Sequence, residues 1–221
     1  MFALFCVGLV GACDASSPDG AVSQNAAVPV GNGFDFYILA LSWSPGYCRS
    51  LGDRADREQC TASPAFEWIV HGLWPQFDRG YPEFCAPGTG ERVPRSLADT
   101  VKDIMPSNGL IQHQWRKHGS CSGLQPDDYF TVTRTAFEKI SRPDIDGSQM
   151  QSFSATHQAI ERAFLNANPD IPPDAIAVTC DRRFLRDVRI CMKRDLTGYV
   201  ACPEVDQRHC PRPDLVVVPA N

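Results

Sequence analysis

The chain has 221 residues, 43% of them hydrophobic, which is enough for one well-buried domain and short for two. Its formal net charge of -5 argues against a protein that coats nucleic acid through a general basic field. A polyanionic partner would therefore have to be held by a local site.

The first 32 residues are expected to be a leader and a flexible tether. Residues 2–13, FALFCVGLVGAC, are too short to span a bilayer and match the hydrophobic region of a signal peptide, although the usual preceding basic residues are missing. The end of this run, VGAC, resembles a bacterial lipobox, so a lipid anchor through Cys13 and an ordinary cleaved signal both stay open. Residues 14–32 are small and polar, and residues 33–221 form the expected domain.

Eight cysteines follow the leader, an even number spread along the whole domain. They contain no Cys-x-x-Cys pair, which weakens the zinc-ribbon and thioredoxin interpretations. Disulfides are therefore favoured, and the expected compartment is oxidising: the periplasm or the cell exterior. The eight are Cys48, Cys60, Cys85, Cys121, Cys180, Cys191, Cys202 and Cys210.

Two stretches at the start of the domain predict strands. Residues 34–43 are aromatic and aliphatic on both faces, which is typical of a central strand covered on both sides. Residues 65–74, AFEWIVHGLW, alternate in polarity and predict a strand that stops at Gly72. His71 is thus expected at a strand end, on the less apolar face.

Three helices are predicted in the middle of the chain. The first is capped by Ser96 and ends at Pro106; the second opens at Pro126; the third opens at Ser154 and ends before Pro169.

Residues 175–180, 187–193 and 215–218 then predict further strands. Strands, helices and again strands indicate an α+β domain with a central, mainly antiparallel sheet flanked by helices and stapled by disulfides.

Three histidines, His71, His113 and His118, are candidate proton carriers, because the usual imidazole pKa of about 6.5 allows proton transfer near neutrality. His71 precedes a glycine, and His118 lies between Lys117 and Gly119, where regular structure breaks and functional side chains are commonly displayed. A structural hydrogen-bonding role is the alternative for each of them.

A metal site fits these residues poorly. His113 and His118 are five residues apart, whereas helical ligands are three or four apart, and Lys117 would repel a cation. No metal or other cofactor is therefore expected; a zinc hydrolase would lose activity with a chelator. A phosphate fits better, because two histidines can act on a phosphodiester as general base and general acid. In RNA the base can activate the 2'-OH, which DNA lacks.

The chain resembles the ribonuclease T2 family. HGLWP, residues 71–75, resembles its first active-site segment, and HQWRKHGSC, residues 113–121, resembles its second, usually HEWxKHG followed by Thr or Ser and Cys. FDFYILALSWSPGYC, GYPEFC and DVRICMK resemble further landmarks, so the likeness spans residues 34–210. It implies that residues 33–221 are a secreted, metal-independent endoribonuclease that cleaves single-stranded RNA, not DNA, through a 2',3'-cyclic phosphate with low base specificity. We expect a monomer.

The resemblance also implies residue roles. His118 matches the general base, and His71 the general acid that protonates the leaving 5'-oxygen. Lys117 matches the cation that stabilises the phosphorane-like state, and His113 a phosphate contact. Trp74 matches the aromatic of the first base site, where stacking tolerates any base, with core packing as its alternative.

Tyr81 is a weaker candidate for that base site. The family pattern also implies the pairs Cys48–Cys60, Cys85–Cys121, Cys180–Cys210 and Cys191–Cys202, whereas the sequence alone allows about a hundred connectivities.

Two glutamines depart from the family pattern: Gln114 replaces the usual glutamate, and Gln76 follows HGLWP where an acid is common. An amide can donate to a phosphoryl oxygen, but it cannot carry a proton or balance positive charge. We expect Gln114 to take part in catalysis and activity to survive, reduced or with a shifted pH optimum. The alternative is a catalytically weakened RNA-binding relative.

The basic cluster of residues 182–194 is interleaved with aspartates and is interpreted as a solvated strand face, with tracking of an RNA backbone as the alternative. His157 and His209 are expected to be structural or exposed.

Overall fold

The computed structural model describes residues 1, 27–85, 92–147 and 149–220. Cys13 and most of the expected leader lie outside this range. Within it, no helix is long and apolar enough to cross a membrane.

In chain order the elements are β1 Phe36–Trp43, α1 Ser44–Leu51, η1 Gly52–Arg54, α2 Arg57–Cys60, β2 Trp68–Gln76, α3 Arg95–Asp99, α4 Asn108–Lys117, η2 Gly119–Cys121, α5 Pro126–Glu138, β3 Phe153–Ala155, α6 His157–Ala167, η3 Pro173–Ala175, β4 Ile176–Asp181, β5 Phe184–Lys193, α7 Pro203–Asp206 and β6 Leu215–Val217.

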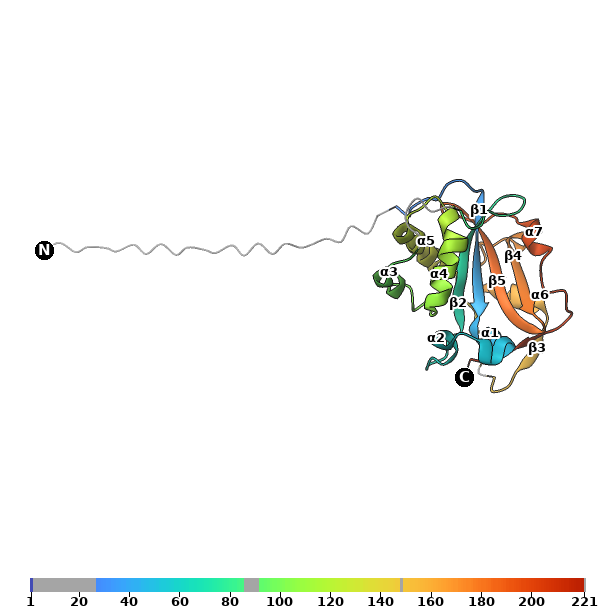
Figure 1. Ribbon diagram of the computed structural model, residues 1–221. Coiled ribbons are helices and arrows are strands. Elements are labelled where there is room, and N and C mark those ends of the chain that lie inside the picture. The colour runs from blue at the N-terminus through green and yellow to red at the C-terminus, as the bar shows by residue number, and fades with distance from the viewer. Residues whose placement is uncertain (2–26, 86–91, 148, 221) are drawn as a thin grey trace.

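One sheet organises the domain (Figure 1). Its strand order is β2-β1-β5-β6-β3, and β4 also pairs with β5. The pairs β1 with β2, β1 with β5, β4 with β5, and β3 with β6 are antiparallel, and the short contact of β5 with β6 is parallel. The predicted α+β class with a mainly antiparallel sheet is confirmed.

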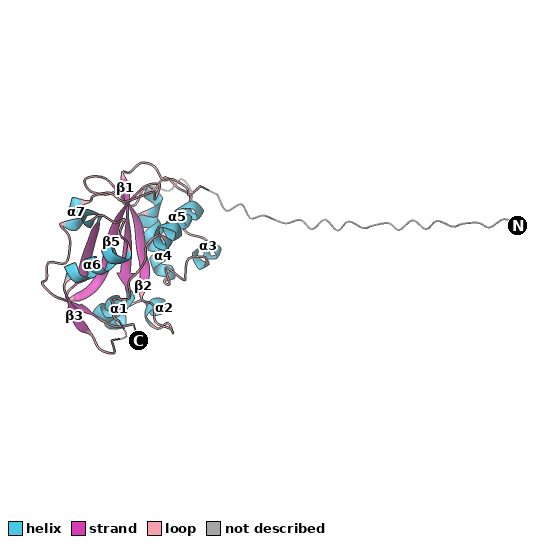
Figure 2. Cartoon of the chain, turned by 180° about the vertical axis from the view of Figure 1, so that it is seen from behind, coloured by secondary structure: helices cyan, strands magenta, loops and turns pink. Residues whose placement is uncertain are grey.

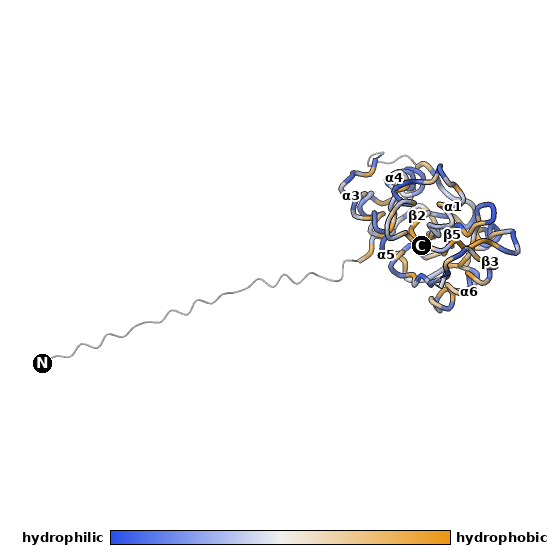
Figure 3. Tube along the Cα trace, turned by 90° about the horizontal axis from the view of Figure 1, so that it is seen from below, coloured by the Kyte–Doolittle hydropathy of each residue, from blue (hydrophilic) through white to orange (hydrophobic). Residues whose placement is uncertain are grey.

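Strand β1 lies between β2 and β5, and all of its side chains are buried. This is the covered strand that its two apolar faces predict. Helices α4 and α5 pack beside β2, and α6 packs against β4, so helices cover the sheet (Figures 1 and 2). The hydrophilic segments lie mostly on the outer helices and loops (Figure 3). Each large side chain buried in this way contributes about 1.5–3 kcal/mol.

Strand β2 differs from its prediction at both ends. It begins at Trp68, and it continues through Gly72 and Pro75 to Gln76. Proline is tolerated there because β2 is at the edge of the sheet, where one side of the strand needs no ladder hydrogen bonds. His71 therefore lies inside the strand and not at its end.

Two predicted helix starts are wrong. Pro94, not Ser96, is the N-cap of α3, which ends at Asp99. Ser154 lies in β3, and α6 is capped by Thr156, whose hydroxyl accepts a hydrogen bond from the Ala159 N–H. Serine and threonine both cap helices, so several of them near a boundary leave the start ambiguous.

Helix α4 was not predicted, although Ser107 caps it by accepting a hydrogen bond from the Leu110 N–H. Its buried face consists of Ile111, Gln114 and Trp115. A polar residue at the centre of that face weakens the apolar periodicity that signals a helix.

The described residues contain four disulfides, whose sequence separations run from 11 to 36 residues. Their pairing is the one that the family resemblance implies: Cys48–Cys60, Cys85–Cys121, Cys180–Cys210 and Cys191–Cys202.

Candidate active site

His71 occupies a β-bulge in β2. Ala40 pairs with Gly72 and Leu41 with Val70, so His71 is the extra residue opposite their junction. A bulge interrupts the ladder and redirects a side chain. Val70 remains fully buried, whereas the His71 side chain is 23% exposed and lines a cavity.

Helix α4 brings the second motif to the same place. The helix packs against β2, and His118 follows its last residue, with its N–H bonded to the Gln114 carbonyl at 3.0 Å. Gly119 allows the chain to pack closely at this point, because a Cβ there would clash with the rings of Trp115 and Tyr129. His113 is in the helix and His118 is just past it, so the two are not a helical ligand pair.

One cavity of about 240 Å³ is lined by all the predicted chemical residues of the two motifs. Three residues nearer the C-terminus also line it: Arg189, from the basic cluster for which tracking of an RNA backbone was the alternative, and Glu204 and Arg208, which no sequence pattern singled out. The predicted members that the structure brings together are His71, Trp74, Tyr81, His113, Gln114, Lys117 and His118.

Trp74 separates the two histidines. Its ring centroid is 5.3 Å from that of His71 and 5.2 Å from that of His118, and the Arg189 guanidinium lies 5.2 Å from the same ring. Trp74 is only 9% exposed, whereas Tyr81 is 42% exposed. Of the two predicted base-site aromatics, Tyr81 presents the more accessible surface, and Trp74 forms a buried wall.

Gln114 is 2% exposed and holds Trp74 in place. The Trp74 indole N–H donates to Gln114 Oε1 at 2.7 Å. Because an indole only donates, the amide orientation follows, and the NH₂ is the group that Gln114 can offer to an anion in the cavity. The other departing glutamine, Gln76, also lines the cavity and donates to the Pro75 carbonyl at 3.1 Å.

Gly72 makes this arrangement possible. A Cβ at Gly72 would clash with Trp74 Nε1 and Gln114 Oε1, the two atoms of the hydrogen bond. Gly72→Ala should therefore break the bond and lower the free energy of unfolding by about 1–3 kcal/mol, measured by urea denaturation. Gly109→Ala is the control, since its Cβ would meet only Ser107 Oγ at 3.5 Å. Equal stability of the two variants would contradict the expectation.

The surroundings of His118 favour the neutral form of its imidazole. It is 6% exposed, and its Nδ1 has no hydrogen-bond partner among the described residues. Burial lowers the His118 pKa to about 3, and the charges of Lys117, His71 and His113 act in the same direction. The pKa of His113 is also lowered, by burial first and then by Lys117 and Arg116. A buried neutral imidazole can accept a proton.

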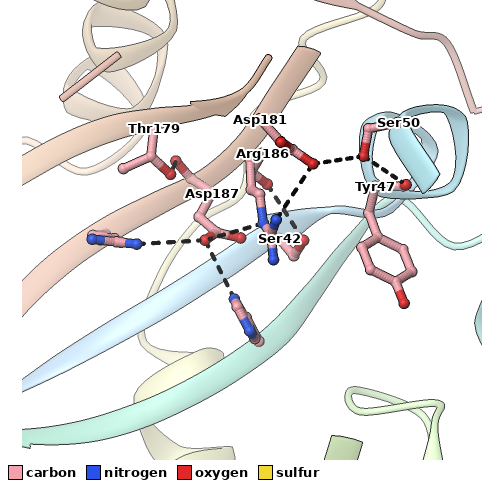
Figure 4. A network of polar contacts seen from close by, with 9 residues as sticks. Ser42, Tyr47, Ser50, Thr179, Asp181, Arg186 and Asp187 are labelled. Carbon is pink, nitrogen blue, oxygen red and sulfur yellow. Dashed lines mark hydrogen bonds and ion pairs between the residues drawn. The ribbon is translucent and has the colours of Figure 1, made fainter. Parts of the chain in front are cut away.

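His71 has the opposite environment. Its Nδ1 lies 3.3 Å from Oδ2 of Asp187. Asp187 is a buried carboxylate on β5, in a polar network with Arg186 (Figure 4). Arg186 and Arg189 flank the same oxygen, so the interpretation of this cluster as a solvated surface is wrong for these residues. A sequence signal existed: Asp187 and Arg189 alternate with the apolar Val188 and Ile190, so they share one face of β5.

Lys117 is paired with a carboxylate from the loop after β2. Its Nζ lies 3.4 Å from Glu83 Oε2, and its carbonyl accepts a hydrogen bond from the Phe84 N–H at 2.9 Å. The neighbouring Cys85 is bonded to Cys121 at the end of the second motif. The GYPEFC segment is thus fixed against the end of α4, and Glu83 partly balances the cation that the sequence analysis left unpaired.

Comparison with known proteins identifies the family of this chain. The Ribonuclease T2 family model matches residues 34–202. A ribonuclease of Aeromonas hydrophila is 32% identical over 203 residues, covering 83% of this chain and 85% of that protein. An RNase-related protein from Calystegia sepium shares the fold, with a TM-score of 0.65 and 20% identity over 85% of this chain and 98% of that one. The structure of RNase NT in complex with 5'-AMP also shares the fold, with a TM-score of 0.58 and 23% identity. That match covers 78% of this chain and 92% of RNase NT. The chain therefore belongs to the ribonuclease T2 family and is an endoribonuclease.

Proposed function

We propose that the protein cleaves single-stranded RNA by metal-independent transphosphorylation, leaving 2',3'-cyclic phosphate ends. The observation that carries this proposal is the contrast between two histidines that line one cavity. His118 is buried and has a pKa of about 3, which favours the neutral base. His71 is hydrogen-bonded through Nδ1 to the Asp187 carboxylate, which leaves Nε2 to give a proton to the leaving group. Environments of this kind assign base and acid to a pair of titratable groups.

The reaction then proceeds by one proton transfer at each side of the phosphate. His118 takes the proton of the 2'-OH, and O2' attacks phosphorus. As the new O2'–P bond forms, the P–O5' bond breaks, and His71 gives its proton to O5'. Lys117, His113 and the Gln114 NH₂ stabilise the negative charge on the phosphoryl oxygens.

The proposed substrate follows from the residues of the cavity, and the proposed compartment follows from the disulfides. DNA is excluded as a substrate because it lacks the 2'-OH. Tyr81 stacks on a base, with Trp74 behind it, which gives low base specificity. We infer a secreted or periplasmic protein, because four disulfides persist in oxidising compartments. Residues 33–221 are the catalytic domain, a monomer; a lipid anchor through Cys13 and a cleaved signal both stay open.

The test is incubation of the purified protein with single-stranded RNA and matched DNA in EDTA, with the product ends identified. RNA is expected to be cleaved to 2',3'-cyclic phosphate ends, and DNA to stay intact. Loss of cleavage in EDTA would support a zinc hydrolase. RNA binding without cleavage, rescued by Gln114→Glu, would support a catalytically weakened relative.

A further inference from the structure

We propose that Asp187 is a positioning residue for the general acid: it orients the His71 ring and stabilises its protonated form during RNA cleavage. The inference rests on the proposed function, in which His71 protonates the leaving oxygen. Asp187 and His71 are 116 residues apart in the chain.

The sheet brings the two side chains together across its central strand. Asp187 of β5 pairs with Ser42 of β1, and Ser42 pairs with Ile69 of β2. The bulge at His71 then turns the imidazole towards the carboxylate, with Nδ1 3.3 Å from Oδ2. Ser42 leaves room for this contact because its side chain is small, and its hydroxyl donates to the Arg186 carbonyl at 3.3 Å.

The contact selects which ring nitrogen reacts. A carboxylate can only accept at neutral pH, so His71 Nδ1 carries the hydrogen, and Nε2 is the nitrogen left for the substrate. The same negative charge stabilises the imidazolium, which is the form that donates a proton. A histidine hydrogen-bonded to a carboxylate in this way is fixed in both tautomer and orientation.

Two arginines keep the carboxylate charged without hydrogen-bonding to it. Arg186 Nε and Arg189 Nη2 both lie 3.9 Å from Asp187 Oδ2, beyond hydrogen-bond range. Burial raises the Asp187 pKa, but the charge and hydrogen bond of His71 and the charges of Arg189 and Arg186 more than offset it, so the pKa is lowered.

A purely structural carboxylate beside arginine would be expected to form a bidentate pair. Instead, among the described residues, His71 is the hydrogen-bond partner of the Asp187 side chain, and Oδ1 has none. The outer member of the network, Asp181, lies 3.6 Å from Arg186 Nη1 and accepts a hydrogen bond from Ser50 (Figure 4). In the part of the chain that the structure describes, Asp181 forms its ion pair with Arg186 and its side-chain hydrogen bond with Ser50, not with His71, so it serves as a matched control.

The charged groups that face His71 come from both sides of the cavity. From β5 they are Asp187, Arg186 and Arg189, from the second motif they are His113, Lys117 and His118, and Glu204 and Arg208 line the same cavity. Among these groups Asp187 is the carboxylate that hydrogen-bonds to His71, so removing its charge takes away the contact that stabilises the protonated ring.

The experiment compares two substrates that differ in their need for an acid. RNA has a strongly basic leaving oxygen, whereas uridine 3'-(para-nitrophenyl phosphate) releases a weakly basic phenolate that needs no proton. Asp187→Asn is expected to lower kcat for RNA by about 10- to 100-fold and to move the alkaline limb of its pH profile to lower pH, with less than about a 3-fold change for the nitrophenyl ester. Asp181→Asn, which removes the same charge, should change neither rate by more than about 3-fold.

Asp187→Asn should also cause no further loss in a His71→Ala background, because the two residues act as a unit. Equal losses on both substrates, or additive losses in the double variant, would overturn the proposal. If Asp187→Asn does not fold, nitrogen-15 NMR of the native protein with labelled histidines shows which ring nitrogen of His71 carries the hydrogen. A neutral His71 ring with the hydrogen on Nε2 would overturn the proposal. If His71→Ala itself retains RNA cleavage, the proposed acid fails, whatever Asp187 does.

Discussion

His118→Ala and His71→Ala are each expected to lower kcat/KM for RNA by about 10²- to 10⁴-fold, the usual contribution of a general base or acid. The two losses should differ in kind. Without His118 no group in the cavity is a buried neutral imidazole that can take the 2'-OH proton, so cleavage of both RNA and an activated nitrophenyl ester should fall. Without His71 only the protonation of a basic leaving oxygen is lost, so the ester should be largely spared. Steady-state rates on both substrates are the measurement.

His157→Ala is the matched control for these variants. His157 lies in α6 and stacks on His209 with ring centroids 4.8 Å apart, and neither lines the cavity. Its loss should leave RNA cleavage unchanged. If either active-site variant cleaved RNA as fast as this control, the assignment of acid and base would be wrong.

The free energy of unfolding is expected to fall by up to about 5 kcal/mol between pH 6.5 and pH 3 because of His118 alone. The folded protein lowers the pKa of this side chain from 6.5 to about 3, chiefly by burial. The unfolded chain therefore binds the proton first as the pH falls. The contribution of His118 is complete above pH 6.5 and is lost progressively down to pH 3.

His118→Gln should remove this contribution, because glutamine does not titrate. The measurement is chemical denaturation of both proteins across the pH range. Their difference is the informative quantity, since acidic groups such as Asp187 affect both curves alike. The native protein should lose stability more steeply than the variant below pH 6.5. Parallel curves would show that His118 is not buried in its neutral form.

Local sequence patterns were sufficient for much of the fold. The apolar run of β1, the start of α5 at Pro126 and the strands β4 to β6 carry signals that lie within a few residues of each other. The boundaries that failed, at Ser96 and Ser154, are places where nearby residues compete for the same capping role. The unpredicted helix α4 carries Gln114 on its buried face, where periodicity requires an apolar residue.

The chemistry of the site was readable because its residues form two short motifs. His71, His113, Lys117 and His118 are identifiable by residue type and spacing, and all of them line one cavity. Their protonation states are not encoded in the motifs. These depend on which groups exclude water from each ring and which charges stand beside it.

The fold class, the two motifs and the candidate proton carriers could be predicted from the amino-acid sequence, because they depend on residue type and short-range period. Which histidine is buried and which is bonded to a carboxylate depends on how the chain folds. Asp187 reaches His71 from 116 residues away, through strand order and a bulge that no local pattern announces. Long-range electrostatics of this kind exist only once the sheet has assembled, and they give two identical side chains opposite tasks.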